Sequence, residues 1–281
     1  MNNMNKLMTT IATAASLAIW SLSATSTSAG EVLDRVLSTK TLTVAVGTDW
    51  GKMSYLDDKH ELAGSDIDLA KAVADRLGVE IKFVTPGWDV ITAGKWEGRW
   101  DLSLGQMTPT KARGEKFSFP AIYFFSPGSA AVHSDSNSTE LSDLNDKTIG
   151  VFASSTFEEY ANGTFQPEWI GAKPIEYAFK AGEVKAYASG NINPLDDLRL
   201  GDGLRLDAVL WDTLKLQKAI EDGYPLKILP GKLFTAPASI AVLHGDKEFS
   251  DKIAEVVDSM RADGALSELT IKWYGADYSV E

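Results

Sequence analysis

A turn rich in threonine with a nearby arginine carries the most suggestive chemistry in this sequence. Residues 105–113 read Gly-Gln-Met-Thr-Pro-Thr-Lys-Ala-Arg, so Thr110 can cap a helix that contains Arg113 in its first turn. A guanidinium can hold a carboxylate through two parallel hydrogen bonds, and neighbouring hydroxyl and backbone N–H groups can complete an anion site. On this segment alone, an Arg113 that points to solvent is an equally good interpretation.

Two further segments place polar groups where strands are expected to end. Phe152 ends one strand and is followed by Ser155 and Glu158, whose spacing is that of a capping box at a helix N-terminus. Such a helix start can also offer free N–H groups to a ligand. Asp212 follows the strand expected at 206–210, where its carboxylate could pair with an ammonium group. A solvated surface aspartate is the equally weighted alternative.

Two tryptophans follow strands of the first half. An aromatic residue in the position of Trp50 or Trp88 belongs more often to the core than to a ligand site. Two of them at neighbouring strand ends strengthen the case for a clamp that stacks on a flat or aliphatic ligand.

The elements that would position these groups alternate between strand and helix. In the first half, strands are expected at 41–47, 80–85 and 101–105, and helices at 66–78 and 89–98. After the polar segment 133–139, strands are expected at 148–152, 206–210 and 238–243, and helices from Ser155, at 195–200 and at 247–260. Residues 273–275 are expected to form a docked C-terminal turn. This order predicts parallel sheets built from βαβ units, in two α/β halves with a crevice between them.

The first 29 residues have the three regions of a secretory signal peptide. Lys6 precedes the uncharged stretch 7–22, and Thr27-Ser-Ala29 has the small-x-small form of a cleavage site. An uncleaved membrane anchor is the alternative, but serine and threonine crowd the second half of this leader, where a spanning helix needs apolar residues. We therefore expect a mature protein that begins near Gly30 and works outside the cytoplasm.

The composition predicts an acidic globular protein without redox or metal chemistry. Of the 281 residues, 44% are hydrophobic and 23% are charged, which is typical of a folded chain. Removal of the leader, whose only charged residue is Lys6, changes the net charge from −12 to −13. Such a chain repels nucleic acid and anionic lipid, so neither is expected as a partner. It contains no cysteine, and its three histidines lack metal-ligand spacing, so no cofactor or metal is expected.

Six motifs occur in the order found in one known family. They are Gly64–Ala70, Gly87–Asp89, Met107–Arg113 with Phe117–Pro120, Asp143–Val151, Leu206–Val209 and Lys272–Gly275. Together they resemble the bacterial polar amino acid-binding proteins of ABC importers, family 3 of the solute-binding proteins. The resemblance covers nearly all of residues 38–277.

The resemblance implies a two-lobed α/β fold, the type II periplasmic binding protein fold. Two crossing strands near 128–136 and 234–242 would form its hinge. The expected division is a signal peptide at 1–29, lobe 1 at 30–133 plus 237–281, and lobe 2 at 134–236. The implied function is that of a periplasmic component of an ABC importer, which closes around an amino acid or a related small zwitterion. We expect a monomer whose protein partner is an inner-membrane ABC permease.

The resemblance also assigns roles to individual residues. Arg113 would hold the α-carboxylate of the ligand and Asp212 its α-ammonium group. The remaining members of the implied ligand-binding set are Trp50, Trp88, Gly105, Gln106, Thr108, Phe152 and Thr156. Of these, Thr108 and the Gly105 carbonyl would assist at the ammonium, Thr156 at the carboxylate, and the aromatic residues would line the side-chain pocket.

The chain departs from the family pattern at three places. Ser65 replaces an aromatic residue, 51–53 replaces a proline-rich turn, and Gly47 stands where binders of basic amino acids often have aspartate. The last change weighs against lysine or arginine as the ligand. We interpret Asp66 and Asp68 as helix N-terminal charges that complement the macrodipole rather than as ligand contacts.

Two other functions are compatible with the same resemblance. A periplasmic dehydratase-like enzyme could use Asp212 as a general acid or base. However, no histidine or cysteine assists it, and the sequence contains no Ser-His-Asp or paired-carboxylate pattern. The receptor domain of a membrane sensor is a weaker alternative, because no later spanning segment follows. We therefore expect a binding protein and not an enzyme.

Overall fold

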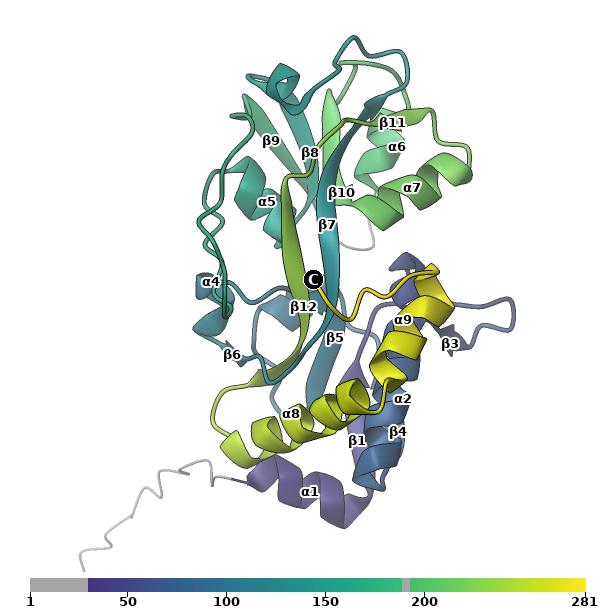
Figure 1. The fold of residues 1–281 in the computed structure, drawn as a ribbon, viewed down its shortest axis with the longest axis vertical. Helices are drawn as coiled ribbons and strands as arrows, with labels where there is room; N and C mark the ends of the chain where they lie inside the picture. The colour runs from purple at the N-terminus through teal and green to yellow at the C-terminus, as the bar shows by residue number, and fades with distance from the viewer. Residues whose placement is uncertain (1–29, 189–192) are drawn as a thin grey trace, which may run out of the picture.

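A two-lobed α/β architecture is visible in the computed structural model, which describes residues 30–188 and 193–281. One lobe contains β1, β4 and β5 with the helices α1, α2, α8 and α9, and the other contains β8 to β11 with α5 to α7 (Figure 1). The long strands β7 and β12 run between them (Figure 1). The expected signal peptide lies outside the described residues.

The first lobe is a parallel sheet with helices packed on it. Its strands are β1 (Thr41–Ala45), β4 (Glu80–Val84) and β5 (Leu102–Met107), and β1 pairs in parallel with both others. Its helices are α1 (Glu31–Thr39), α2 (Ser65–Leu77), α3 (Trp88–Thr92), α4 (Lys111–Gly114), α8 (Lys247–Ala262) and α9 (Ala265–Tyr274). Short elements complete it: η1 (Gly51–Met53), β2 (Tyr55–Leu56), β3 (Leu62–Ala63) and β6 (Phe117–Ser118). Apolar residues at helical spacing on α2 and α8 pack against β1 and β5, which gives this lobe its core.

The second lobe repeats the plan on a smaller scale. Its strands are β8 (Thr148–Phe152), β9 (Glu183–Tyr187), β10 (Ala208–Asp212) and β11 (Leu226–Ile228). β8 pairs in parallel with β9 and β10. Its helices are η2 (Leu141–Leu144), α5 (Thr156–Ala161), α6 (Pro194–Leu198) and α7 (Thr213–Glu221). Two clusters of buried apolar side chains, separate from the core around α2 and α8, fill the spaces on the two faces of its sheet.

The crossing strands β7 (Ile122–His133) and β12 (Phe234–Leu243) join the lobes into one continuous sheet of order β4-β1-β5-β12-β7-β10-β8-β9. They pair antiparallel from Phe234 opposite Gly128 to Ser239 opposite Ile122. Each carries a proline within the paired stretch, Pro127 and Pro237. Because proline lacks an N–H group, it removes a ladder hydrogen bond at this crossing.

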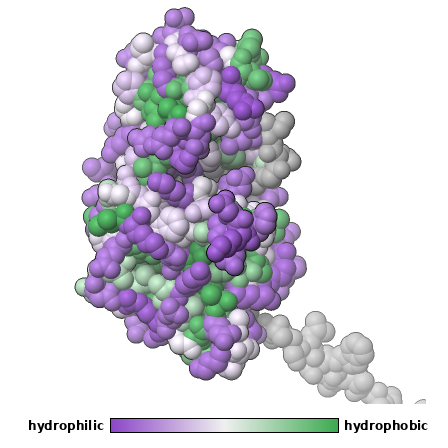
Figure 2. All heavy atoms as spheres, turned by 90° about the vertical axis from the view of Figure 1, so that its right-hand side faces the viewer, coloured by the Kyte–Doolittle hydropathy of each residue, from purple (hydrophilic) through white to green (hydrophobic). Residues whose placement is uncertain are grey.

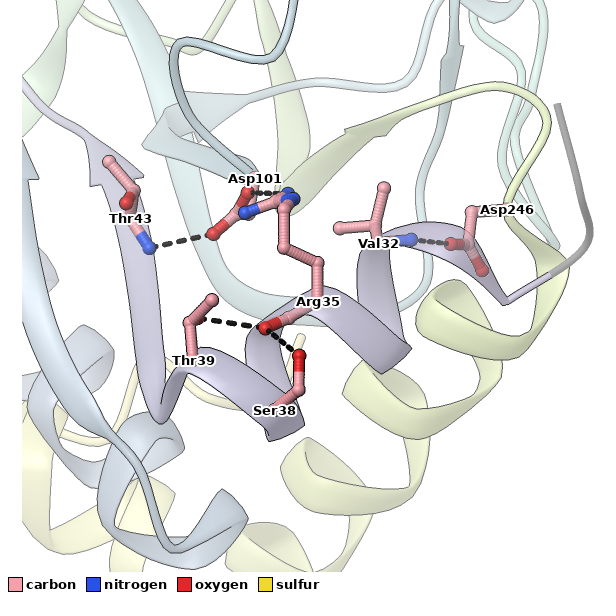
Figure 3. Close-up of polar contacts among 7 residues, drawn as sticks. All are labelled: Val32, Arg35, Ser38, Thr39, Thr43, Asp101 and Asp246. Atoms are coloured by element: carbon pink, nitrogen blue, oxygen red, sulfur yellow. Dashed lines mark hydrogen bonds and ion pairs between the residues drawn. The ribbon is translucent and has the colours of Figure 1, made fainter. Parts of the chain in front are cut away.

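The N-terminal helix α1 is fastened to the first lobe by side-chain contacts (Figure 3). The buried Asp101 carboxylate accepts hydrogen bonds from the Arg35 guanidinium and, at 2.8 Å, from the Thr43 N–H group of β1. The Val32 N–H group donates to the Asp246 carboxylate, which lies at the start of α8, at 2.6 Å. These bonds hold α1 between β1 and α8, away from the cleft.

Several element predictions require correction. The first crossing strand begins at Ile122 and ends at His133 instead of covering 128–136, because the β-prone run after Ala121 already pairs with β12. The helix expected at 89–98 starts one residue earlier and ends at Thr92. The expected turn at 273–275 is instead the end of helix α9, with Gly275 in the left-handed conformation as its C-cap.

One face of the molecule is mainly polar. Figure 2 shows the face on the right of Figure 1, where hydrophilic residues cover most of the area and hydrophobic ones are scattered among them. Within residues 30–188 and 193–281, none of the helices combines the length and the apolar character that crossing a bilayer requires.

Candidate functional site

A cavity of about 360 Å³ lies between the two lobes beside the crossing strands. All nine residues of the predicted ligand-binding set line it: Trp50, Trp88, Gly105, Gln106, Thr108, Arg113, Phe152, Thr156 and Asp212. They lie at the carboxyl ends of β1, β4, β5, β8 and β10 or in the segments that follow these strands, where open α/β sheets bind ligands. Their direct contact with a ligand stays a prediction.

Arg113 is the cation of the first lobe. Thr110 caps α4, as expected, and its hydroxyl accepts from the Arg113 N–H group at 3.4 Å. The guanidinium is buried, donating to the Thr108 carbonyl at 2.9 Å and to the Ser154 carbonyl at 2.8 Å, and it lies 5.6 Å from the Trp88 ring centroid. Burial lowers the pKa of Arg113 to about 10, so the side chain is protonated at neutral pH.

Asp212 is the anion of the second lobe. It is the last residue of β10 and the N-cap of α7, where one carboxylate oxygen accepts from the N–H groups of Leu214 (2.9 Å) and Lys215 (3.2 Å). The other oxygen accepts from the Ser126 hydroxyl on the crossing strand β7. The side chain is buried and lines the cavity, so the solvated alternative is wrong. Three donors therefore fix the position of this carboxylate at the cavity wall.

Two glycines form the floor under the two tryptophans. The rings of Trp50 and Trp88 meet edge to face, with centroids 5.6 Å apart. A Cβ atom on Gly105, whose φ is +134°, would lie 2.6 Å from the Trp50 ring and 3.0 Å from the Trp88 ring. A Cβ atom on Gly47 would lie 2.2 Å from the Trp50 ring. The absence of an aspartate at position 47 is therefore explained by the indole that covers it.

The remaining predicted residues complete the walls. Gln106 has a positive φ of 54°, and its N–H group donates to the Tyr123 hydroxyl at 2.9 Å. Thr108 and Thr156 are both buried at the cavity. Ser155 caps α5 by accepting from the Glu158 N–H group, and the Glu158 carboxylate accepts from the Ser154 N–H group instead of from Ser155 itself. The capping-box prediction is thus right at one bond and shifted by one residue at the other.

The lobes touch directly at one edge of the cavity. The Ser154 carbonyl of lobe 2 accepts from the Arg113 guanidinium and, at 3.2 Å, from the indole N–H of Trp88. The backbones also pair there, since Lys111 donates to the Gln166 carbonyl at 3.0 Å and the Glu168 N–H donates to the Pro109 carbonyl at 3.1 Å. The same residues that are predicted to meet the ligand therefore also hold the lobes together.

Sequence reasoning missed several cavity residues of the second lobe and the crossing strands. They are Ser126, Phe157, Trp211, Lys215 and Phe234. Trp211 packs against Phe152 with the rings tilted and their centroids 4.7 Å apart, and Phe157 packs in a similar way against Phe234 at 5.3 Å. Trp211 directly precedes Asp212, and Lys215 follows it by three residues. This closeness to a predicted site residue is the sequence signal that could have identified both. The place of Ser126 depends on the register of β7 and could not be read locally.

Asp66 departs from its interpretation as a simple helix charge. It does lie in the first turn of α2, but it is 1% exposed, and neither carboxylate oxygen has a hydrogen-bond partner among the described residues. Burial raises the pKa of Asp66 to about 7, while the nearby Tyr123 hydroxyl and the Lys215 charge offset part of that cost. Asp68 behaves differently, since it accepts from Lys272 at 2.7 Å and from the Trp273 indole at 2.8 Å.

Metal coordination finds no support in the described part of the chain, which contains no cluster of three or more histidine, cysteine, aspartate or glutamate side chains suited to a metal ion. Of the histidines, His133 ends β7 in a buried position, and His244 contacts the Gly114 carbonyl at 2.7 Å and the Ser118 hydroxyl at 3.0 Å. The cavity instead offers a cation and an anion from each lobe, Arg113 and Asp49 from the first and Lys215 and Asp212 from the second, between aromatic walls. These features define a class of protein that encloses a small solute between two α/β lobes.

The chain belongs to a specific family within that class. Residues 42–276 match the family model of the bacterial extracellular solute-binding proteins, family 3. It is 28% identical to a probable amino-acid ABC transporter-binding protein of Haemophilus influenzae, over 89% of this chain and 90% of that one. It is 26% identical to the L-cystine-binding protein TcyJ of Escherichia coli, over 88% and 87% of the two chains.

Solved structures show the same architecture. An ABC uptake transporter substrate-binding protein from Streptococcus pneumoniae with bound histidine is 25% identical and superposes with a TM-score of 0.75, covering 90% of this chain and 99% of that one. An ancestral amino acid-binding protein, described as a precursor of cyclohexadienyl dehydratase, is 26% identical with a TM-score of 0.72, over 86% and 99% of the chains. The relatives are named as binding proteins, and the type II fold expected from the sequence is confirmed.

Proposed function

We propose that this protein binds an α-amino acid or a closely related zwitterion in the interlobe cavity and presents it to an inner-membrane ABC permease. The observation that carries the proposal is the pair formed by Arg113 and Asp212. These two buried, oppositely charged side chains come from different lobes and line one cavity. An amino acid carries both complementary charges on one carbon atom, so it can bridge them.

The contacts suggest how each end would be held. The Arg113 guanidinium is fixed by the Thr108 and Ser154 carbonyls, and its remaining N–H groups can face a carboxylate in fork geometry. The N–H groups of Thr156 and Phe157, at the start of α5, donate no hydrogen bond within the described residues and can assist there. The Asp212 carboxylate, with the Gly105 carbonyl and the Thr108 hydroxyl, would receive the ammonium group.

Closure is the proposed mechanism. The two crossing strands act as the hinge, and the ligand stabilises the closed arrangement because it contacts both lobes at once. Periplasmic binding proteins are a standard example of hinge closure. The lobe division at 30–133 with 237–281 and at 134–236 is part of this proposal, as are the signal peptide at 1–29, the periplasmic location and the monomeric state.

An enzymatic role is less well supported. One of the similar solved structures is described as a precursor of cyclohexadienyl dehydratase, so a dehydratase-like activity is the alternative to test. However, the Asp212 carboxylate is held in place by three hydrogen bonds from Ser126, Leu214 and Lys215, which suits a fixed binding group. Binding without turnover is therefore the expectation.

The deciding experiment is a thermal-shift panel of amino acids on protein that has been unfolded and refolded to remove carried-over ligand. A ligand at a hundred times its Kd adds about 2.7 kcal/mol to the free energy of unfolding, which raises the melting temperature measurably. We expect at least one α-amino acid to do so and its decarboxylated and deaminated analogues to fail. No shift with any amino acid, or product formation from a bound acid, would contradict the proposal.

A further inference from the structure

Lys215 is a second cation in the cavity. The proposed contacts of the ligand with Arg113 and Asp212 give it no role. It is the third residue of α7, it lines the cavity, and it is only partly exposed. Its ammonium nitrogen lies 5.1 Å from the centroid of the Trp211 ring, so the indole face supports the charge from one side.

The ammonium group of Lys215 has no partner among the described residues. No carboxylate oxygen there lies within 4.0 Å of it, and it donates no hydrogen bond in the same part of the chain. Lys215 donates to the neighbouring Asp212 only through its backbone N–H group, not through its ammonium group. Lys215 is therefore not the partner of a structural ion pair, and its hydrogen-bonding capacity is available to a ligand.

An acidic group on the opposite lobe complements this cation. Asp49, in the loop after β1, lines the same cavity and likewise takes part in no ion pair or side-chain hydrogen bond within the described residues. Burial lowers the pKa of Lys215, and the charges of Asp212, Asp66 and Asp49 act against this shift. The first pair, Arg113 and Asp212, thus has a second pair beside it, again with one charge from each lobe.

The cleft also continues past this second pair. A further hollow of about 370 Å³ runs along α7 toward Gln217 and Tyr224, and Asp49 and Lys215 line both spaces. A ligand whose head group lies between Arg113 and Asp212 therefore has room to extend its side chain between Asp49 and Lys215.

We infer that Lys215 and Asp49 determine specificity by selecting amino acids whose side chain ends in a group with both an acceptor and a donor. A carboxamide and a second amino-acid head group have this character. A cationic side chain would be repelled by Lys215, and an anionic one by Asp49. An apolar side chain would leave both charges desolvated and unpaired, which binding sites built from polar groups penalise strongly. This inference rests on the proposed function and adds the ligand class to it.

The test compares ligand preference before and after removal of the Lys215 charge. Calorimetry on refolded protein would use L-glutamine and meso-diaminopimelate as dipolar ligands, with L-lysine, L-glutamate and L-norleucine for comparison. The wild-type protein should bind the two dipolar ligands most tightly. In Lys215→Met, affinity for L-glutamine should fall about ten- to a hundred-fold, as expected for a lost hydrogen bond to a charged group, while affinity for L-norleucine should hold or rise.

Lys247→Met is the matched control. Lys247 lies on α8 of the first lobe, is paired with Asp251, and lines neither the cavity nor the further hollow, so its substitution should change no affinity. Should Lys215→Met not fold, Asp49→Asn at an exposed loop position serves instead, and should selectively weaken the dipolar ligands several-fold. An equal loss for all ligands, or a wild-type preference for lysine or norleucine, would overturn the inference alone. Absence of any amino acid binding would overturn the proposed function as well.

Discussion

Substitution of Arg113 by alanine is the sharpest test of the cavity. Its guanidinium is the predicted carboxylate clamp, and it is 7% exposed. Removal of one partner from a desolvated, hydrogen-bonded charge pair typically costs ~2–5 kcal/mol. Because ~1.4 kcal/mol corresponds to a tenfold change in Kd, the affinity for an amino acid should fall by about 30-fold to several thousand-fold.

The structure adds a second consequence for the same variant. Without the guanidinium, the carbonyls of Thr108 and Ser154 lose a donor, and one of these bonds joins the two lobes. Unpaired buried acceptors cost ~1–3 kcal/mol each, so the ligand-free protein should also unfold at a lower temperature. Arg113→Lys keeps the charge but not the fork geometry, and should lie between wild type and alanine in affinity.

Calorimetry and thermal unfolding on refolded protein separate the two effects. The matched control is Arg76→Ala, because Arg76 pairs with Asp263 and Ser259 on the surface of the first lobe, away from the cavity. That exposed pair should change stability by no more than ~1 kcal/mol and affinity not at all. Because the pKa of Arg113 is about 10, its guanidinium stays protonated between pH 6 and 8, and the wild-type affinity should not fall in that range through loss of this charge. An Arg113→Ala protein that binds within threefold of wild type would refute the assigned role.

Three further predictions concern the surroundings of the cavity. In Gly105→Ala, the added Cβ atom would meet both indoles at a φ of +134°, so binding measured by tryptophan fluorescence should weaken at least tenfold, and an unchanged affinity would contradict the assigned packing. The pKa of the Asp66 carboxyl is about 7 in the folded protein and 3.8 in the unfolded chain, so the free energy of unfolding should fall as pH rises from about 4 to about 7. In Asp66→Asn, chemical unfolding at several pH values should show a weaker dependence of this free energy on pH. Asp101→Ala removes the acceptor of Thr43 and Arg35 and should lower the free energy of unfolding, measured by urea titration, by ~1–3 kcal/mol. Ligand affinity should not change. A weakened affinity would contradict the placement of α1 away from the cleft.

Much of the fold could be predicted because the sequence signals are local. The helix expected at 66–78 and the strands expected at 80–85 and 148–152 agree with α2, β4 and β8 within one residue. Their periodicity and terminal glycines are fixed by neighbours in sequence. The lengths and register of β7 and β12 depend instead on pairing between residues more than a hundred positions apart. Local signals alone therefore predict a first crossing strand that begins later than β7 does.

The site shows the same division between local and long-range information. The family motif supplied Arg113, Thr108 and Gly105, and the structure places all of them at the cavity. Lys215 belongs to no family motif. It faces the cavity because α7 begins at Thr213, which places Lys215 in the first turn of the helix. Asp66 looked like an ordinary helix N-terminal charge, and only the packing of Tyr123 and α9 around it makes it a buried carboxyl without a hydrogen-bond partner.

Asp212 links the helix start to the chemistry of the cleft. Its carboxylate caps α7 through the N–H groups of Leu214 and Lys215, so the predicted ammonium receptor also fixes the helix that carries the second cation. Loss of an N-cap side chain destabilises a helix by ~1 kcal/mol, and a shift of α7 would move Lys215 as well. Truncation of Asp212 would therefore change two recognition groups at once, whereas Arg113 on the opposite lobe can be altered without moving α7. Asp212 and Lys215 are therefore coupled through helix α7 of lobe 2, whereas their partners on lobe 1, Arg113 and Asp49, can be substituted independently.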